Sequence, residues 1–504
     1  MQFNSFIFIL FFLPITCLGY YLLNHFDREK EAKGYLLLMS LWFYGYFNAS
    51  YLVIICSSIC VNFLLYKKMQ TAKSRRPYLI LGLLFNVGLI FYFKYYNFFL
   101  QNLNDAFKTD FVLRTIVLPL GISFFTFQQI SFIVDAYKGE AVGYSFLEYA
   151  LFVSFFPQLV AGPIVLHSEL IPQFRDKTRH RVNFDNLSKG IMLFSRGLAK
   201  KVLIADTFGK AVDWAFAQAA VVQVGEGALT RAEIIILMLS YTFQIYFDFS
   251  GYSDMATGLG SMFNLKIPMN FNSPYKALSV ADFWKRWHKT LTRFLTTYIY
   301  IPLGGNRKGK LRTYLNIMIV FTISGIWHGA NWTFILWGIL HGLAQCFNKL
   351  THGIYEAVYN AVSKSFLGKA GAALIKTVQW IVTFAFLNVT WLLFRANSVT
   401  EWVQILKRLF VLNLDVRDGM LEAFRIPRFR YVMSAIGLSA EDHAVLLACM
   451  FIMMVLALCL CLLFKNNYER KYEFKVSSLA FTWVLIVTCV ISLSSVSTFL
   501  YFNF

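Results

Sequence analysis

Long apolar stretches, separated by short polar or basic segments, recur along the whole chain. Spanning a bilayer as a helix takes about 20 apolar residues, and many stretches reach or approach that length. They lie at about 3–23, 35–49, 50–66, 78–100, 112–134, 144–166, 187–205, 232–250, 314–349, 372–394, 444–464 and 477–503. The pattern predicts an all-α fold, a polytopic helical membrane protein with about 11–13 membrane helices plus short re-entrant and interfacial helices.

Proline and glycine interrupt several of these stretches. The interruptions are Pro119 and Gly121, then Pro157, Gly162 and Pro163, and finally Gly325 and Gly329. Broken helices are tolerated at membrane depth where they line a cavity or are covered by protein. Simple kinks in packed helices explain the same residues equally well. A less hydrophobic middle segment, about 167–313, predicts short or surface-lying helices rather than plain spans.

Composition supports the membrane assignment. Of 504 residues, 58% are hydrophobic and only 15% are charged, which excludes both an ordinary soluble protein and a disordered one. No phosphate-binding loop, dinucleotide fingerprint or zinc-ligand spacing occurs, so nucleotide hydrolysis and metal chemistry are not indicated. The net charge of +20 is spread over loops, which argues against a nucleic-acid partner.

Basic loops predict the orientation. Segments 24–34, 67–77 and 465–475 are rich in Lys and Arg, whereas segment 101–111 between them is not. Basic loops stay in the cytoplasm, so we expect both termini on the extracytoplasmic side. The first stretch lacks a basic leader and a small-residue cleavage site, which favours a retained span over a signal peptide.

Carboxylates follow an apolar run in QIYFDFSGYSDMATGLG, residues 244–260. Asp248, Ser250 and Asp254 lie within about one and a half helical turns of one another. Two carboxylates six residues apart do not share a helix face, but a turn at Ser-Gly-Tyr-Ser would bring them closer. Either they bind substrate, because ionisable groups at membrane depth are functional by default, or they are hydrogen-bonded structural residues at a helix break.

A basic amphipathic helix is predicted in DFWKRWHKTLTRFL, residues 282–295. Its apolar stripe contains Trp284 and His288, and a neighbouring face is basic. The basic residues are Lys285, Arg286, Lys289 and Arg293. Such a helix would lie in the headgroup region and direct His288 inward. The basic face suits either anionic lipid or the phosphates of an acidic substrate such as a coenzyme.

A second histidine, His328, lies midway along FTISGIWHGANWTFILWGILHGL, residues 321–343. Glycines flank it, which would let a substrate approach, and Asn331 and Trp332 follow it by one helical turn. A neutral imidazole at this depth suits a general base, although a buried histidine can also be purely structural. His341, further along, points to another face and is expected to be structural. Upstream, Gln128, Gln129, Asp135 and Gln158 suit either a polar cavity lining or hydrogen bonds between helices.

Several long motifs resemble one known family. The run FQIYFDFSGYSDMATGLG, NFNSPYKALSVADFWKRWHKTLTRFL, YIPLGGNRKG and GIWHGANWTFILWGILHG is similar to the membrane-bound O-acyltransferase superfamily. LPLGISFFTFQQISFIVDAYKGE and RGLAKKVLIAD resemble its bacterial alginate O-acetylation branch. We therefore expect a single membrane domain over residues 1–504, with its strongest motif core at about 118–345 and C-terminal helices over 372–504.

The resemblance implies a central tunnel or funnel with His328 as the catalytic histidine and His288 at the second active-site position. Substrate-binding or orienting residues are then expected at Trp327, Asn331, Asp248, Ser250, Asp254, Trp284, Lys285, Arg286, Lys289, Thr290 and Arg293, with no metal ion. The implied donor is acetyl-CoA or an acyl carrier protein, with no tightly bound cofactor. Implied partners are the bilayer, a periplasmic or secreted acetyltransferase and an exopolysaccharide.

The function expected from this resemblance is an O-acyltransferase of the bacterial inner membrane. It would move an acyl group, in the first instance acetyl, from a cytoplasmic thioester to hydroxyls of an extracytoplasmic polysaccharide. Transfer would be direct or through a periplasmic partner. Three alternatives stay open. One is D-alanyl transfer to a cell-wall polymer, and another is transport of an anionic solute, because broken helices and intramembrane charges also occur in transporters. The third is a scaffold that only recruits periplasmic enzymes to a polysaccharide export complex.

Overall fold

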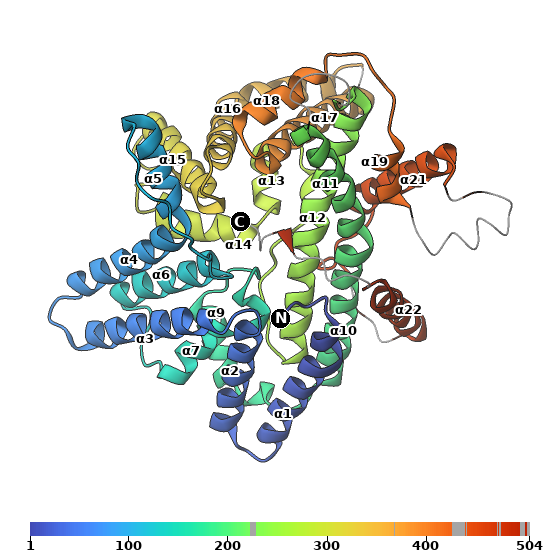
Figure 1. The fold of residues 1–504 in the computed structure, drawn as a ribbon. Helices are drawn as coiled ribbons and strands as arrows, with labels where there is room; N and C mark the ends of the chain where they lie inside the picture. Colours follow the sequence, from blue (N-terminus) through green and yellow to red (C-terminus); the bar gives the residue numbers. More distant parts are fainter. Residues whose placement is uncertain are drawn as a thin grey trace.

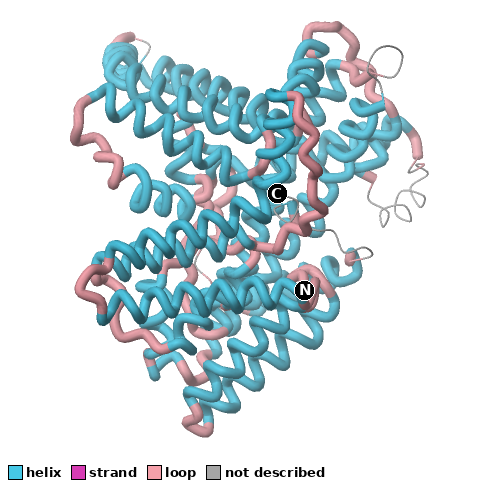
Figure 2. Tube along the Cα trace, turned by 60° about the vertical axis from the view of Figure 1, so that its left-hand side comes forward, coloured by secondary structure: helices cyan, strands magenta, loops and turns pink. Residues whose placement is uncertain are grey.

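The structure, a computed structural model, describes residues 1–221, 228–366, 368–425, 439, 441–470, 472, 475–493 and 499–500. Within these ranges every regular element is a helix, as Figures 1 and 2 show. The all-α prediction is therefore confirmed. The orientation of the chain in the bilayer stays a prediction.

Most helices in the first part of the chain coincide with the predicted apolar stretches, but residues 112–121 of the stretch at 112–134 lie outside a helix. Their bounds are η1 Phe8–Phe12, α1 Leu13–His25, α2 Glu29–Gly45, α3 Ser50–Thr71, α4 Arg76–Ile90, η2 Phe91–Tyr95, α5 Tyr96–Phe107 and α6 Ile122–Lys138. Shorter helices follow: α7 Phe146–Ser154, α8 Phe156–Leu159, α9 His167–Arg175 and η3 Lys177–Arg179. The prolines and glycines after residue 156 thus break the stretch predicted at 144–166.

The second part contains the longest helices. Their bounds are α10 Phe184–Ala199, η4 Lys200–Ala205, α11 Asp206–Val221, α12 Arg231–Met262, α15 Lys310–His328, α16 Trp332–Lys364 and α17 Gly368–Arg395. Short elements between or after them are η5 Pro274–Lys276, α13 Val280–Arg286, α14 Lys289–Leu295, η6 Thr296–Tyr300, α18 Val399–Arg408, α19 Asp418–Leu421 and η7 Glu422–Phe424. Two further helices are α21 His443–Leu462 and α22 Val476–Ser492.

Six helices of the described ranges are long and apolar enough to cross a membrane. They are Phe8–His25, Ser50–Thr71, Arg76–Phe107, Arg231–Met262, Gly368–Arg395 and His443–Leu462. Their surroundings differ greatly. In the most apolar window of α12, 89% of residues are buried, against 11% for Arg76–Phe107. The first is a central helix surrounded by protein, and the second presents its apolar surface outward, as a lipid-facing span does.

Two hydrophobic cores meet along α12, which runs through the middle of Figure 1 beside α10. The first core joins α1–α4 and α6–α9 to the carboxyl-terminal half of α12 and includes Tyr252 and Trp327. The second joins the amino-terminal half of α12 to α11, α16, α17 and α21 and includes Tyr246 and Trp337. Residues at the boundary therefore contact both cores.

Glycines in α12 serve helix packing and not a turn. The helix continues without a break through Ser250–Ser253, so the turn predicted there is wrong. A Cβ on Gly251 would lie 2.8 Å from the carbonyl oxygen of Gly197, and one on Gly258 would lie 2.7 Å from that of Gly190. Two glycines on each helix thus let α10 and α12 approach closely, an arrangement that helix pairs in membranes favour.

The other predicted interruptions have mixed outcomes. Gly121 adopts φ +70° immediately before α6, where a Cβ would meet the carbonyl oxygen of Leu159 at 2.8 Å. Gly329 follows the last residue of α15, so a break there is confirmed. Gly325, in contrast, lies inside α15. A Cβ on it would be 3.1 Å from the Cα of Gly338, so it permits close packing of α15 on α16.

Candidate functional site

His288 occupies a break between two short helices. The single amphipathic helix predicted over 282–295 is wrong, because α13 ends at Arg286 and α14 begins at Lys289. His288 adopts φ +43°, in the left-handed region that non-glycine residues rarely visit. Its side chain is fully buried, so the inward direction predicted for it is confirmed. Strain of this kind persists where the surroundings fix it, and it concentrates at functional sites.

Asn270 fixes this break and the histidine ring. Its Oδ1 lies 3.1 Å from Nδ1 of His288 and accepts the Thr290 hydroxyl at 2.9 Å. Its main-chain oxygen accepts the Lys289 N–H at 2.9 Å. Because an amide oxygen only accepts, Nδ1 of a neutral His288 carries the proton, and Nε2 carries the lone pair. The Thr290 hydroxyl in turn accepts the N–H of Ile164 at 3.0 Å.

Sequence reasoning missed Asn270. Asn270 is the first residue of NFNSPYK, a polar segment between two hydrophobic ones. Its place at the start of this polar segment was the sequence signal that could have pointed to it.

His328 is the last residue of α15, and α16 begins four residues later. It is 3% exposed, and its ring contacts Trp337 and Phe394, each with a centroid separation of 5.1 Å. Asn331 is the N-cap of α16: its Oδ1 accepts the Thr333 N–H at 3.0 Å. Its amide also donates to the Asn397 carbonyl at 2.9 Å. Because capping engages Asn331, an orienting role toward His328 stays a prediction.

Trp327 lies between the two histidines. Its ring centroid is 6.1 Å from that of His288 and 4.8 Å from that of His328. Phe124, from the first turn of α6, contacts both Trp327 and His288, with centroid separations of 5.3 and 6.5 Å. The structure thus brings together two histidines that are 40 residues apart in the sequence, in an aromatic environment where the two cores meet.

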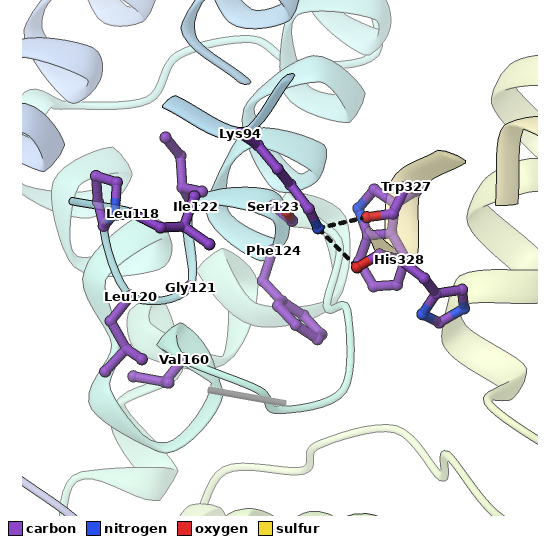
Figure 3. Close-up of a pocket in the computed structure, with 11 residues that line it drawn as sticks. Lys94, Leu118, Leu120, Gly121, Ile122, Ser123, Phe124, Val160, Trp327 and His328 are labelled. Carbon is purple, nitrogen blue, oxygen red and sulfur yellow. Dashed lines mark hydrogen bonds between the residues drawn. The ribbon is translucent and has the colours of Figure 1, made fainter. Parts of the chain in front are cut away.

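Two of the cavities in the described part of the chain are lined by residues between Trp327 and Phe334. The first, of about 30 Å³, is lined by Lys94, residues 118–124, Val160, Trp327 and His328. Figure 3 shows these side chains and the way the His328 ring extends away from Lys94. The second, of about 320 Å³, is lined by Phe93, Lys94, Asn97, Ile116, Leu118, Gly329, Ala330 and Phe334. Lys94 and Leu118 line both, whereas a tunnel through the protein stays a prediction.

Lys94 is a further residue that sequence reasoning missed. Its ammonium donates to the carbonyls of Trp327 at 2.7 Å and His328 at 2.8 Å (Figure 3). It is the single charged residue between Tyr78 and Asn104, in an apolar stretch, and this isolation was the available signal.

The predicted basic face is partly neutralised by acids, one on the same helix and one on α9. Arg286 pairs with Asp282 at 2.9 Å, and Arg293 makes a two-point pair with Glu169. Lys285 is exposed and Lys289 is half-buried. The indole N–H of Trp284 donates to Nδ1 of His341 at 3.1 Å, and Nε2 of that histidine lies 3.2 Å from the Thr390 hydroxyl. Trp284 and His341 therefore form a buried hydrogen-bonded pair, in keeping with the structural role expected for His341.

The α12 carboxylates are ion-paired. Lys201 lies 2.7 Å from Asp248 and 2.9 Å from Asp206, and Lys200 lies 2.6 Å from Asp254. The Lys200 ammonium also donates to the Ser250 hydroxyl at 3.4 Å. We call Lys200, Lys201, Asp206, Asp248 and Asp254 the lysine–aspartate cluster. Its geometry favours the structural alternative, and substrate binding by Asp248, Ser250 or Asp254 stays a prediction.

Gln129 and Asp135, upstream of the histidines, connect helices by hydrogen bonds. Gln129 donates to the Ser58 hydroxyl at 2.8 Å and accepts the Tyr149 hydroxyl at 3.0 Å, which links α6 to α3 and α7. Asp135 accepts the Tyr298 hydroxyl at 2.7 Å and lies 3.1 Å from Nε2 of His167. Gln129 and Asp135 therefore form hydrogen bonds between helices, which was the second of the two roles considered for them.

Comparison with known proteins identifies the family. Residues 83–395 match the membrane-bound O-acyltransferase family. The chain belongs to that family. It is 39% identical to a peptidoglycan O-acetyltransferase of Helicobacter pylori, over 100% of this chain and 98% of that protein. It is 35% identical to the probable alginate O-acetylase AlgI of Pseudomonas aeruginosa, over 79% of this chain and 73% of that protein.

A more distant relative is a teichoic acid D-alanyltransferase of Streptococcus thermophilus, 26% identical over 45% of this chain and 56% of that protein. The chain is thus a multi-pass membrane O-acyltransferase, as the sequence motifs predicted. Membership in an acyltransferase family favours the acyltransferase over the transporter alternative.

Proposed function

We propose that this membrane-bound O-acyltransferase moves an acetyl group from a cytoplasmic thioester to hydroxyl groups of an extracytoplasmic envelope glycan. Similarity over the whole length to a peptidoglycan O-acetyltransferase favours peptidoglycan as the acceptor. The relation to an alginate O-acetylase supports the same reaction on a different polymer. Transfer occurs directly or through a periplasmic partner, from the bacterial cytoplasmic membrane.

The observation that carries this proposal is the position of His328 beside a cavity, with His288 on the other side of Trp327. An imidazole is the group most often used to move a proton at neutral pH. Aromatic side chains surround both rings and exclude water, which protects a reactive thioester from hydrolysis.

The chemistry follows from acyl transfer. The acceptor hydroxyl attacks the thioester carbonyl, a C–O bond forms, and His328 takes the hydroxyl proton. The tetrahedral intermediate then collapses, the C–S bond breaks, and the proton passes from His328 to the leaving thiolate. General base catalysis of this kind contributes about 10²–10⁴-fold. His288, held by Asn270 and packed against Trp327, positions the acceptor beside His328.

The donor is acetyl-CoA or an acyl carrier protein, both polyanionic. Lys285 and Lys289 are the residues of the predicted basic face without an ion pair among the described residues. Attraction of a polyanion to such residues raises its local concentration and falls with ionic strength. Arg286 instead pairs within α13, and Arg293, which pairs with Glu169, holds α14 against α9.

Replacement of His328 tests the proposal. His328→Ala is expected to abolish acetyl transfer, measured as ester-linked acetate released by mild alkali from purified peptidoglycan of cells that carry only the variant. His352→Ala, an exposed histidine on α16, is the matched control and is expected to retain transfer. Both proteins must reach the membrane in equal amounts, as measured by immunoblot. Ester acetate at the control level in His328→Ala cells would overturn the assignment.

A second candidate is D-alanyl transfer, which the partial similarity to a teichoic acid D-alanyltransferase favours. The two candidates differ in the product. Mild alkali releases acetate from an acetylated glycan and D-alanine from an alanylated polymer, so amino acid analysis of the same hydrolysate separates them. Release of D-alanine that depends on His328 would replace acetyl transfer with this second reaction.

A further inference from the structure

Three consecutive carbonyls at the end of α15 are bound by two neighbouring residues of a different helix. The Tyr95 hydroxyl donates to the carbonyl of Ile326, and the Lys94 ammonium donates to those of Trp327 and His328. The partners are more than 230 residues apart in sequence: the separations are 231, 233 and 234. The carboxyl end of the helix that bears His328 is therefore held by the span Arg76–Phe107.

A helix end inside a membrane needs such partners. The last four carbonyls of a helix have no partner in their own helix, and water is not available at membrane depth to bind them. A positive charge at this end is also favoured by the helix dipole, whose negative pole lies there. Lys94 supplies two hydrogen bonds and a charge at the same point.

The backbone of the donor helix is adapted to this task. Residues Phe91–Tyr95 form a π-helical turn between α4 and α5. Single π turns are uncommon and often occur at functional sites, because the extra residue changes which side chains face a neighbour. Here two adjacent residues, Lys94 and Tyr95, both reach α15. A lysine at this depth is costly, and the contact with α15 offsets that cost.

Lys94 acts on His328 through the main chain. The His328 ring extends away from Lys94 in Figure 3, while its carbonyl faces the ammonium. We propose that Lys94, with Tyr95, is a positioning residue that holds the last turn of α15 and thereby sets the His328 ring for acyl transfer. This inference rests on the proposed function of His328, and it adds a residue that neither the motifs nor the burial pattern indicated.

Kinetics of matched variants test the proposal. Lys94→Met keeps the length of the side chain and removes its charge and its donors. Its kcat, measured as thiol released from acetyl-CoA by protein in liposomes with added peptidoglycan fragments, is expected to fall about 10- to 100-fold, with KM for acetyl-CoA nearly unchanged. Tyr95→Phe is expected to lose less, and Lys94→Arg to recover part of the rate. Tyr92→Phe, exposed on the same π turn, is the control and should equal wild type.

Hydrogen exchange gives a readout that does not depend on activity. In Lys94→Met, amides at the end of α15 are expected to exchange faster, while α10 and α12 keep their protection. Unchanged exchange together with unchanged kcat would overturn the inference. A uniform rise in exchange across the protein would also overturn it, because it would mean that Lys94 supports the whole fold.

Failure of the inference and failure of the proposed function are distinguishable. If His328→Ala retains transfer, the proposed function fails regardless of Lys94. If His328→Ala is inactive and Lys94→Met has the wild-type kcat, the function stands and the inference about Lys94 is wrong.

Discussion

The lysine–aspartate cluster and the histidine pair, His288 and His328, are both buried groups of ionisable side chains, yet their surroundings differ. In the cluster each of the three aspartates pairs with a lysine, Lys201 serving two of them, and Asp248 also accepts the Leu500 N–H at 3.0 Å. The histidines are surrounded by aromatic rings, and His328 lines a cavity. Charge neutralised by close partners stabilises a packed interior, whereas a polar group beside a cavity can meet a substrate.

The same difference in surroundings explains why the motif at 244–260 is a weaker indication of a catalytic site than the motif at 321–343. Both have polar residues among apolar ones, and both contain glycines. In α12 the glycines bring two helices together, while the glycine after His328 coincides with the end of a helix. Polar residues at a helix end have more freedom to face a cavity than those enclosed between helices.

Among the changes that compare these two regions, the largest effect is expected at His288. Asparagine tolerates positive φ, so His288→Asn keeps the left-handed backbone at φ +43° and removes only the imidazole. We expect kcat to fall about 10²–10⁴-fold, as for loss of a group that orients or moves a proton. The thiol-release assay measures kcat, and the melting temperature in detergent reports the fold. A normal kcat in folded His288→Asn protein would place His288 with the structural residues.

Removal of a lysine from the cluster tests its structural role. Lys201→Met leaves Asp248 and Asp206 without their partner, and the Lys201 and Asp248 side chains are only 3% and 2% exposed. Unpairing a buried charge costs about 3–5 kcal/mol, so the melting temperature should fall strongly. Lys200→Met, whose lysine is 21% exposed, should lose less. If Lys201→Met melts normally but has no activity, the cluster has a chemical role after all.

A pair of glycine substitutions compares the two regions directly. In Gly197→Ala the new Cβ would lie 2.5 Å from the Gly251 carbonyl oxygen, so α10 and α12 must separate. This should cost about 1–3 kcal/mol in unfolding free energy with little change in kcat. In Gly329→Ala the Cβ would lie 2.1 Å from the Phe334 ring, which lines the larger cavity. There we expect a loss of kcat greater than the loss of stability, and the reverse result would contradict the comparison.

The smallest effect, on stability, is expected for the ion pair between Glu148 and Arg175. This pair lies outside both regions and serves as a reference. The hydrogen bond from the Arg175 guanidinium, at 2.6 Å, lowers the pKa of Glu148 from 4.5 to about 2. A lowered pKa means that the pair stabilises the fold above pH 4.5 and that this contribution disappears as the pH falls toward 2. Because solvent screens the pair, the contribution should be below about 1 kcal/mol.

Melting temperatures of wild type and Glu148→Gln, measured from neutral pH downward, check this expectation. The difference between them should shrink as the medium becomes acidic. A constant difference would mean that the pair is not the source of the stability change.

Local patterns predicted much of the fold. Most of the apolar stretches became helices, because hydrophobic length and helix formation depend on nearby residues. Residues 112–121 are an exception and lie outside a helix, and the stretch at 314–349 is divided between α15 and α16. The burial of His288 and His328 was also expected from their apolar neighbours. The helix over 282–295 was mispredicted, since the fixed break at His288 depends on Asn270, eighteen residues before it. Periodicity alone could not reveal a hydrogen bond from a distant segment.

The sequence by itself determined that this protein is a helical membrane O-acyltransferase with two inward histidines, since composition, apolar length and long motifs are properties of contiguous residues. Only the tertiary structure decided which polar groups are neutralised and which face a cavity. Lys201 meets Asp248 across 47 positions, Arg293 meets Glu169 across 124, and Lys94 meets Trp327 across 233. The partner of a buried charge is set by how the helices pack, and no local pattern contains that information.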